Sequence, residues 1–156
     1  MDGYRRPPIV VGEFRDQEGE VIPYGRRWDN VPASDLPYSV TAHPERFAPI
    51  VDVARALAAS LPEAHRTGGS GATAEFTVAI EITPFPGAMI SVAGHDFVFP
   101  PCGCDACDED VEQLAEDMEL LVDAVVAGRF EATRYSFRYW GEWGSKGGST
   151  NPIGRV

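Results

Sequence analysis

Three cysteines lie close together in the sequence and form its most reactive cluster. Cys102, Cys104 and Cys107 have the spacing Cys-x-Cys-x-x-Cys, and Gly103 lets the backbone between the first two curl tightly. Because such a turn can bring three sulfurs to one point, the spacing favours a metal site. Thiolates prefer zinc over magnesium or calcium, and an iron–sulfur cluster usually needs four thiolates, so we expect zinc.

A closed structural zinc site needs a fourth ligand, which this set of cysteines does not contain. The fourth ligand therefore has to come from His95, Asp105, Asp108 or a group of another chain. We include His95 with the three cysteines in the predicted metal site. Four protein ligands would indicate a structural ion, whereas three ligands and a water would leave a position at which chemistry can occur.

Two other interpretations of the cysteines remain open. They can be small, partly buried residues in a tight turn, since free cysteine often packs like a small apolar residue. They can also be redox or nucleophilic thiols, because Cys107 lies near the start of a helix, whose dipole lowers a thiol pKa. However, the carboxylates between Asp105 and Asp110 raise a thiol pKa, and no basic residue lies nearby in the sequence. A bound cation would deprotonate the thiols regardless, so this acidic setting favours a metal over a nucleophile.

Length and charge limit the class of protein. The chain has 156 residues, which suits one domain with a core of its own. Its 24 acidic and 13 basic residues give a formal charge of −11, which repels phosphate backbones and anionic lipid surfaces. We therefore expect neither nucleic acid nor membrane as a partner. The N-terminus lacks the apolar core of a signal peptide and the chain has no long apolar run, so we expect a cytoplasmic protein.

Hydrophobic periodicity predicts two amphipathic helices and four strands. Helical spacing covers residues 44–61 and 108–127, and Pro49 places the regular start of the first helix at that residue, after a separate turn. The Pro-Gly turn at residues 86–87 indicates that the first two strands pair antiparallel. Alternation of apolar and polar residues places the strands at residues 73–83, 88–92, 97–99 and 130–140.

These elements predict an α+β fold, with two amphipathic helices packed on one face of an antiparallel sheet of about four strands. The single domain is expected to span residues 36–143. Residues 1–35, which are interrupted by proline and glycine, are predicted to form an arm with a short hairpin that lies on the domain. Residues 144–156, rich in glycine and serine, are predicted to form a flexible tail.

The second helix has an acidic side without basic residues. We expect a solvated face, with a docking surface for a basic partner as the alternative. The arginines of the arm are expected to pair with this helix; they are Arg5, Arg6, Arg26 and Arg27. The aromatic residues of the last predicted strand are expected to pack in the core and at the sheet edge rather than to form a binding face.

Three phrases of the sequence resemble a family of uncharacterised actinobacterial proteins, a domain of unknown function. They are Thr-Ala-His-Pro-Glu-Arg-Phe-Ala-Pro at residues 41–49, Phe-Pro-Gly at 85–87 and Pro-Cys-Gly-Cys-Asp-Ala-Cys-Asp-Glu at 101–109. The resemblance covers residues 35–131, and the Cys-Gly-Cys-Asp-Ala-Cys-Asp phrase is its most specific part. Because no activity is known for that family, the resemblance implies no reaction and assigns no catalytic residue.

The function expected from the sequence is that of a small acidic binding or adaptor domain with a structural zinc site at the cysteines. Its partner would be another protein or a second copy of the chain. The alternative is a small thiol- or zinc-dependent enzyme that uses the same cysteines, for which His43, His65 and His95 are the histidines available as a general base. Enzymatic activity is left open, and we assign no catalytic or organic-cofactor-binding residue.

Overall fold

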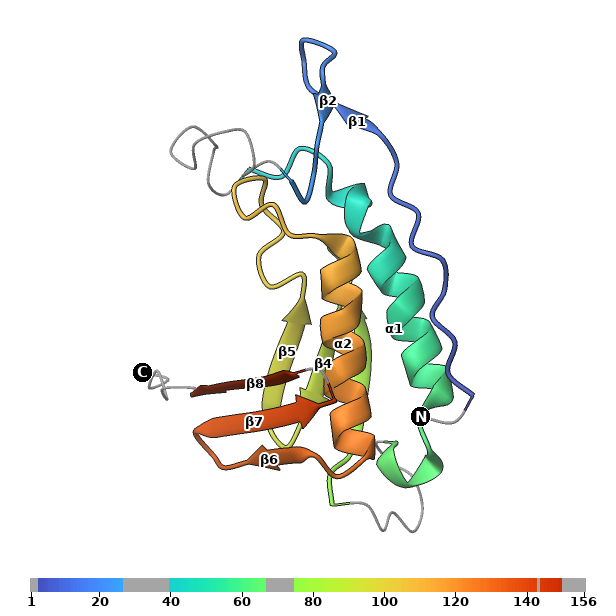
Figure 1. Ribbon diagram of the computed structural model, residues 1–156, viewed down its shortest axis with the longest axis vertical. Coiled ribbons are helices and arrows are strands. Elements are labelled where there is room, and N and C mark those ends of the chain that lie inside the picture. Colours follow the sequence, from blue (N-terminus) through green and yellow to red (C-terminus); the bar gives the residue numbers. More distant parts are fainter. Residues whose placement is uncertain (1–2, 27–39, 67–74, 143, 150–156) are drawn as a thin grey trace.

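The computed structural model describes residues 3–26, 40–66, 75–142 and 144–149. Two α-helices run side by side, and the described strands form three small antiparallel sheets around them (Figure 1). The elements in chain order are β1 (Phe14–Arg15), β2 (Val21–Ile22), the 3₁₀ helix η3 (Pro44–Phe47), α1 (Ala48–Ser60), the 3₁₀ helix η4 (Glu63–His65), β3 (Val78–Thr83), β4 (Gly87–Val92), β5 (His95–Phe99), α2 (Val111–Val126), β6 (Phe130–Ala132), β7 (Ser136–Gly141) and β8 (Gly144–Ser149).

The first α-helix follows a separate 3₁₀ turn, as predicted. Pro49 lies in the first turn of α1, where its missing N–H costs no helical hydrogen bond. The buried stripe of Ile50, Val53 and Leu57 faces the protein interior, where α1 packs on β3, β4 and α2. The predicted start of the helix at Pro49 is confirmed to within one residue.

The hairpin from β3 to β4 and the next strand, β5, form a three-stranded sheet in the order β3-β4-β5. Its register places Ile80 opposite Ile90 and Ile90 opposite Phe97, which confirms the predicted antiparallel pairing. Ala93 and Gly94 turn the chain between β4 and β5 with φ of 53° and 79°, values that a two-residue hairpin turn requires. The first strand begins at Val78, later than predicted; residues 73 and 74 lie outside the described residues.

The second α-helix begins where an aspartate caps it. The Asp110 carboxylate accepts a hydrogen bond from the backbone N–H of Gln113 at 2.9 Å, so α2 begins at Val111, three residues after the predicted Asp108. Gly128, with φ of 69°, terminates the helix as predicted. Neither helix in the described part of the chain has the length and apolar character needed to cross a bilayer.

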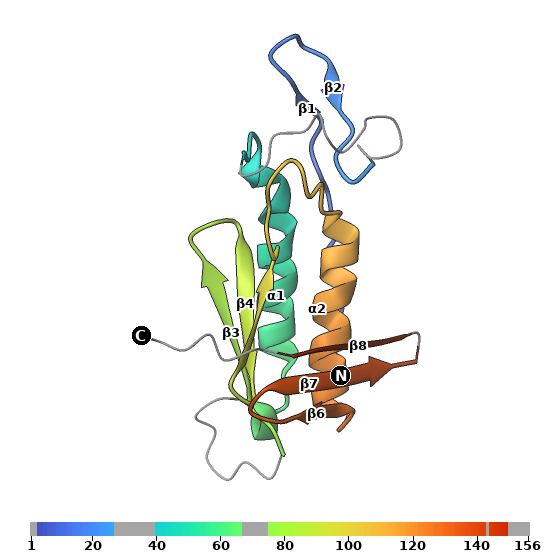
Figure 2. The ribbon, with the colours of Figure 1, turned by 90° about the vertical axis from the view of Figure 1, so that its left-hand side faces the viewer.

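The predicted sheet of about four strands is wrong, because the last strand does not join β3-β4-β5. The C-terminal strands form their own sheet, β6-β7-β8, which runs across the direction of β3–β5 in both views (Figures 1 and 2). Aromatic rings explain this arrangement. Phe97 of β5 makes edge-to-face contacts with Phe130, Phe137 and Tyr139, so the second sheet packs on β5 by a face instead of extending its edge. The α2 helix packs on α1 and on β7.

The predicted strand 130–140 is divided by a turn. The Thr133 hydroxyl accepts hydrogen bonds from the backbone N–H groups of Tyr135 and Ser136 at 3.3 and 3.1 Å, which bends the chain between β6 and β7. Residues 144–149, predicted as part of a flexible tail, instead form β8 and pair with β7. Glycine is a poor strand former, so the composition of β8 did not predict a strand. Residues 150–156 lie outside the described part.

The N-terminal arm follows the helices to the β1–β2 hairpin at one end of the molecule (Figure 1). Arg6 pairs with the acidic side of α2, as predicted: its Nε donates to Glu119 Oε1 at 2.8 Å, and Nη1 pairs with Glu112. The phenol of Tyr4 donates to the same Glu119 oxygen at 2.5 Å. Arg27 lies outside the described residues, so its pairing stays a prediction.

Candidate metal centre

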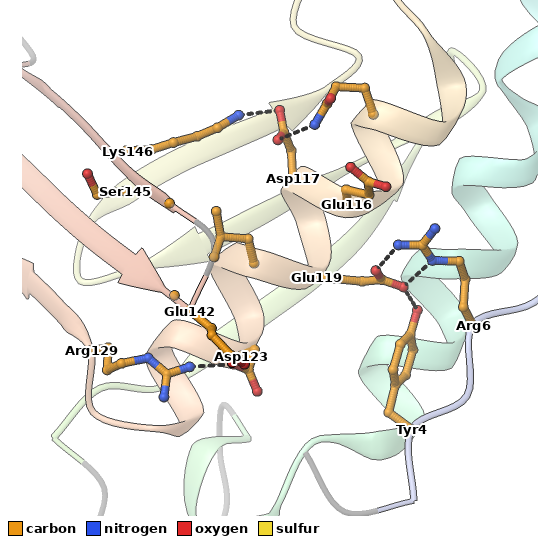
Figure 3. Close-up of a pocket in the computed structure, with 14 residues that line it drawn as sticks. Tyr4, Arg6, Glu116, Asp117, Glu119, Asp123, Arg129, Glu142, Ser145 and Lys146 are labelled. Carbon is orange, nitrogen blue, oxygen red and sulfur yellow. Dashed lines mark hydrogen bonds and ion pairs between the residues drawn. The ribbon is translucent and has the colours of Figure 1, made fainter.

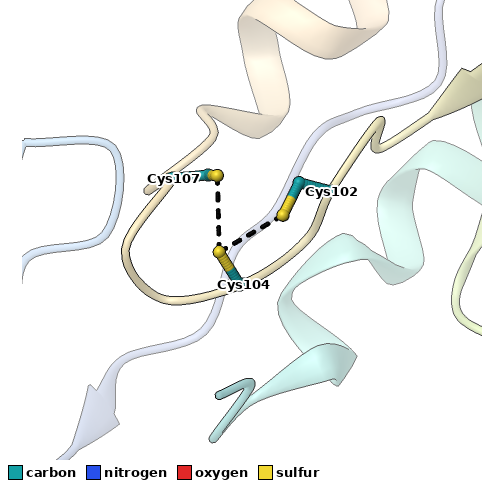
Figure 4. Close-up of side chains that lie close together, drawn as sticks. All are labelled: Cys102, Cys104 and Cys107. Carbon is teal, nitrogen blue, oxygen red and sulfur yellow. Dashed lines mark hydrogen bonds between the residues drawn. The ribbon is translucent and has the colours of Figure 1, made fainter. Parts of the chain in front are cut away.

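The loop between β5 and α2, residues 100–110, brings the three cysteines together. The Sγ atom of Cys104 lies 3.2 Å from Sγ of Cys102 and 3.3 Å from Sγ of Cys107 (Figure 4). All three sulfurs lie within 4.8 Å of one another, and no disulfide joins them. A zinc ion bonded to sulfur at about 2.3 Å holds its thiolates about 3.8 Å apart. The loop therefore needs only a small adjustment to place three thiolates around one ion.

Gly103 allows the loop to curl between the first two cysteines. Its φ is 79°, and a Cβ added there would lie 2.7 Å from Cζ of Phe85. Both the left-handed backbone and the close approach of the ring require glycine. Asp108, which follows the last cysteine, also has a positive φ, of 46°, an uncommon conformation for a residue with a side chain. The backbone of the loop therefore has a positive φ both within the cysteine cluster, at Gly103, and directly after it, at Asp108.

Arg46 supports the cysteine loop from inside the protein. Its Nη1 donates to Oδ1 of Asp105 at 3.0 Å, and its Nη2 donates to the carbonyl oxygen of Gly103 at 3.2 Å. Both members of this ion pair are buried, with Arg46 1% and Asp105 4% exposed. The rings of Tyr24 and Phe47 lie 4.0 and 4.3 Å from the guanidinium carbon, so cation–π contacts add to the pair.

The importance of Arg46 was not predicted from the sequence, although a signal was present. Arg46 lies four residues before Ile50 and eleven before Leu57, so it continues the apolar stripe of α1 towards the N-terminus. A charged residue in line with a buried stripe indicates either a solvated end or a buried partner. The partner, Asp105, lies 59 residues away in the sequence and could not be identified from this pattern.

The carboxylate of Asp105 also attaches the loop to other segments. Its Oδ1 accepts a hydrogen bond from the Tyr24 hydroxyl at 3.1 Å, and its Oδ2 accepts one from the Ala42 backbone N–H at 3.1 Å. The backbone N–H of Asp105 donates to the Val40 carbonyl oxygen at 2.7 Å. Asp105, a predicted alternative ligand, therefore serves to join the arm, the start of the domain and the cysteine loop.

Two further carboxylates of the loop accept backbone hydrogen bonds. Oδ1 of Asp108, the other alternative ligand, accepts one from the Gly25 N–H of the arm at 2.9 Å. Oε2 of Glu109 accepts one from the Gly103 N–H at 2.6 Å, which closes the loop on itself. These contacts hold the loop and the arm in one arrangement around the sulfurs.

His95, the predicted fourth ligand, is not brought to the cysteines. It lies at the first residue of β5, and the cysteine loop follows the opposite end of this strand, about 13 Å away at the usual rise per residue. Its Nε2 lies 2.8 Å from the Thr133 carbonyl oxygen, and its ring packs on Phe137 with a centroid distance of 5.3 Å. Among the described residues, the group of mutually close ligand atoms at this loop consists of the three sulfurs.

The other two histidines are also held away from the sulfur cluster. The ring of His43 lies between Glu45 and the Arg15 carbonyl oxygen, at 3.0 and 3.2 Å. Nδ1 of His65 lies 3.0 Å from the Phe76 carbonyl oxygen. The described histidines therefore contribute to local structure and supply no general base next to the thiols.

The thiol of Cys107 strongly prefers its protonated form. Hydrogen bonds with Cys104 and Cys102, together with burial, raise the pKa of Cys107 to about 12. Without a cation, this thiol is protonated at neutral pH and is a weak nucleophile. A coordinated divalent cation deprotonates a thiol, so the same group becomes a metal ligand when an ion is present.

A separate cavity of ≈ 1100 Å³ lies beside α2, between the arm and the β7–β8 hairpin (Figure 3). Three cations line it, and each pairs with a carboxylate of α2; the pairs are Arg6 with Glu119, Arg129 with Asp123, and Lys146 with Asp117. Glu116 and Glu142 also line the cavity, and Glu116 interacts electrostatically with Arg6. The lining therefore has more carboxylates than cations.

Comparisons with known proteins place the chain in a family without assigning an activity. Neither the curated proteins nor the solved structures contain a match to it. The predicted membership in an uncharacterised family is confirmed, whereas an actinobacterial origin and the cysteine phrase as a family feature stay predictions. The family described as "Family of unknown function (DUF6226)" matches residues 10–79 and 69–154, and the chain belongs to this family.

Proposed function

We propose that the cysteine loop binds one Zn²⁺ ion through the thiolates of Cys102, Cys104 and Cys107, within a small acidic binding or adaptor domain. The convergence of three cysteine sulfurs within 4.8 Å carries this proposal. The ion would fix the junction between β5 and α2. Because Asp105 and Asp108 attach the arm to the same loop, the ion would also stabilise the docked arm.

Charge and ligand softness support zinc at this loop. Asp105 is balanced by Arg46, but the neighbouring Asp108, Glu109 and Asp110 bring further negative charge. Three thiolates without a cation would repel one another and these carboxylates, whereas a divalent ion compensates for them. Thiolate ligands favour zinc over the hard cations calcium and magnesium, which prefer oxygen.

The fourth coordination position is proposed to hold a water molecule. His95 is engaged at the other end of β5, and Asp105 and Asp108 accept hydrogen bonds from the arm. Two of the sulfurs, those of Cys102 and Cys107, belong to exposed residues, so water can approach the ion from this side. A site with three protein ligands and water has the coordination from which zinc enzymes work, and this keeps the enzymatic alternative in place.

The enzymatic alternative is supported by that accessible position and opposed by the surroundings. The described histidines make contacts elsewhere, and Cys107 is a poor nucleophile at neutral pH because its pKa is raised. A binding role therefore fits better. If the thiols of the metal-free protein nevertheless react with a disulfide reagent far faster than free cysteine at pH 7, the enzymatic alternative gains the stronger position.

The surface charge supports a binding or adaptor role with a protein partner. The chain has a formal charge of −11, and the cavity beside α2 is lined by more carboxylates than cations. Such a surface speeds association with a partner of opposite charge. A second copy of the chain is the other candidate partner, and sedimentation equilibrium over a range of protein concentrations distinguishes a homodimer from a monomer.

Metal analysis of the purified full chain tests the zinc proposal. We expect about one zinc per chain, lost in Cys104→Ser, because three thiolates hold the ion together. His95→Gln is the matched control, since His95 lies at the far end of β5 and its replacement should leave the zinc content unchanged. Circular dichroism confirms that each variant is folded.

Two results would contradict the proposal. Wild-type protein that stays metal-free after incubation with zinc, with three titratable thiols, would return the cysteines to a purely packing role. Loss of zinc in His95→Gln but not in Cys104→Ser would move the site away from the cysteine loop altogether.

A further inference from the structure

The three thiols are arranged unequally, and Cys104 is the one in the middle. Its sulfur makes both short contacts, 3.2 Å to Cys102 and 3.3 Å to Cys107 (Figure 4). Cys104 is 4% exposed, whereas Cys102 and Cys107 are exposed. A reagent from solvent therefore meets one of the outer thiols first, and a buried thiol lies next to whichever one it meets.

We propose that this loop is a reversible oxidation site in which Cys104 is the shared resolving thiol and the Cys104–Cys107 disulfide is the main product. The oxidant is a low-molecular-weight disulfide. Where the inference concerns release of zinc, it rests on the function proposed above; formation of the disulfide does not depend on it.

The reaction consists of two thiol–disulfide exchanges. In the first, the small fraction of Cys107 that is ionised at pH 8 attacks one sulfur of the oxidant as a thiolate, forms a mixed disulfide and releases one small thiolate. In the second, Cys104 gives its proton to solvent, and its sulfur attacks the Cys107 sulfur of the mixed disulfide, so the second small thiolate leaves. Two protein thiols are oxidised and one small disulfide is reduced to two small thiols.

The loop is built so that the central thiol stays in place while an outer one moves. The residue after Cys104 is fixed by its backbone hydrogen bond to the Val40 carbonyl oxygen and by the Arg46 ion pair. A disulfide bond is about 2.05 Å long, so the Cys107 sulfur has to approach Cys104 by little more than an ångström. The Cys-x-x-Cys spacing of this pair is also the spacing used by dithiol oxidoreductases.

Closure of this disulfide removes two of the three proposed zinc ligands. The remaining thiol of Cys102 cannot hold the ion by itself, because stable protein zinc sites use three or four protein ligands. Oxidation therefore releases the ion, and reduction restores the site.

The test uses the full chain, both metal-free and zinc-loaded, with oxidised glutathione at pH 8. Wild-type protein and Cys102→Ser are expected to lose two thiols each, with peptide mapping by mass spectrometry showing the Cys104–Cys107 link. Cys104→Ser should instead accumulate the glutathione adduct, with internal disulfide formed at least about tenfold more slowly, since the resolving sulfur is missing. With the zinc-loaded protein, a chromogenic chelator should detect one released zinc per disulfide formed. Treatment with dithiothreitol should restore all thiols.

The inference is overturned if Cys104→Ser closes a Cys102–Cys107 disulfide as fast as the wild type closes its own. It is overturned equally if wild-type protein stops at the glutathione adduct. Both results are read from metal-free protein, so they are independent of zinc. If the disulfide forms as expected but the chain never binds zinc, the oxidation site stands and the zinc proposal fails.

Discussion

The guanidinium of Arg46 reaches the cysteine loop from η3, the short helix that precedes α1. It joins the Asp105 carboxylate and the Gly103 carbonyl oxygen in one buried network. Burial of an ion pair gains little stability by itself, because both charges lose their water. We infer that the Arg46–Asp105 pair mainly fixes the backbone path of the cysteine loop, which brings the three sulfurs close together.

Removal of one partner should therefore be costly. Arg46→Ala leaves the Asp105 carboxylate buried without its cation, and we expect the free energy of unfolding to fall by about 3–5 kcal/mol. Urea denaturation of the metal-free protein measures this loss. Weaker zinc binding should accompany it, because the Gly103 carbonyl also loses its donor.

The matched control is Arg55→Ala. Arg55 pairs with Asp52 at 3.3 Å on α1, and both side chains are 65% exposed, so this pair contributes less than about 1 kcal/mol. Equal destabilisation by the two substitutions would mean that only the loss of one positive charge matters at Arg46. That result would contradict the proposed role of Arg46 in fixing the path of the cysteine loop.

At the scale of elements, the N-terminal arm is attached to the domain at two places. One is the cysteine loop, through Tyr24 and Gly25. The other is α2, where Glu119 accepts hydrogen bonds from both Tyr4 and Arg6. Because the attachments lie near opposite ends of the arm, loss of one should loosen that end while the other stays docked.

Glu119→Ala should free the first part of the arm without unfolding the domain. Limited digestion with an arginine-specific protease is expected to cleave between Arg5 and Arg6 faster than in wild type, because cleavage requires an undocked backbone. Far-ultraviolet circular dichroism should show unchanged helix content. Glu131→Ala is the control, as Glu131 is an exposed acid of β6 in the C-terminal sheet. Equal cleavage rates in the two variants would show that Glu119 does not hold the arm.

At the scale of the whole molecule, the aromatic contacts between β5 and the C-terminal sheet join the two halves of the core. Tyr139 lies in this cluster and is 4% exposed. Burial, and to a smaller extent the Asp117 carboxylate, raise the pKa of Tyr139 to about 12 from its usual 10.0. The folded protein therefore holds this proton at pH values where an unfolded chain has lost it.

This shift predicts a loss of stability in alkali. The contribution of the Tyr139 proton is complete below pH 10 and falls as the pH rises towards about 12, because only the unfolded state ionises in that range. Urea denaturation between pH 9 and 12 should show a smaller decline for Tyr139→Phe than for wild type. Tyr135→Phe, at a position 47% exposed, should follow the wild type. Parallel curves for wild type and Tyr139→Phe would exclude this explanation.

Much of the secondary structure could be predicted because it follows from local periodicity. Three features involve residues that are close in the sequence: the helical stripe ending in Leu57, the antiparallel pairing of β3 with β4, and the turn of the chain at Gly103. The proximity of the three sulfurs belongs to the same class, since six residues with one glycine allow few other arrangements.

The remaining features depend on residues that are distant in the sequence. Periodicity shows which side chains of a strand share a face. It does not show whether that strand extends the edge of a sheet or packs on the face of the sheet. The contact of Phe97 with Phe137 belongs to the face-to-face packing that the structure adopts. For the same reason the sequence did not show that strand β5 places His95 away from the cysteines. It also did not show that Arg46 pairs with Asp105, because the two residues come together only in the folded chain. The local sequence pattern thus determined the secondary-structure elements and the sulfur cluster. Long-range packing determined the arrangement of the sheets and the contacts that support the cysteine loop, because interactions between residues distant in the sequence produce no periodic pattern in it.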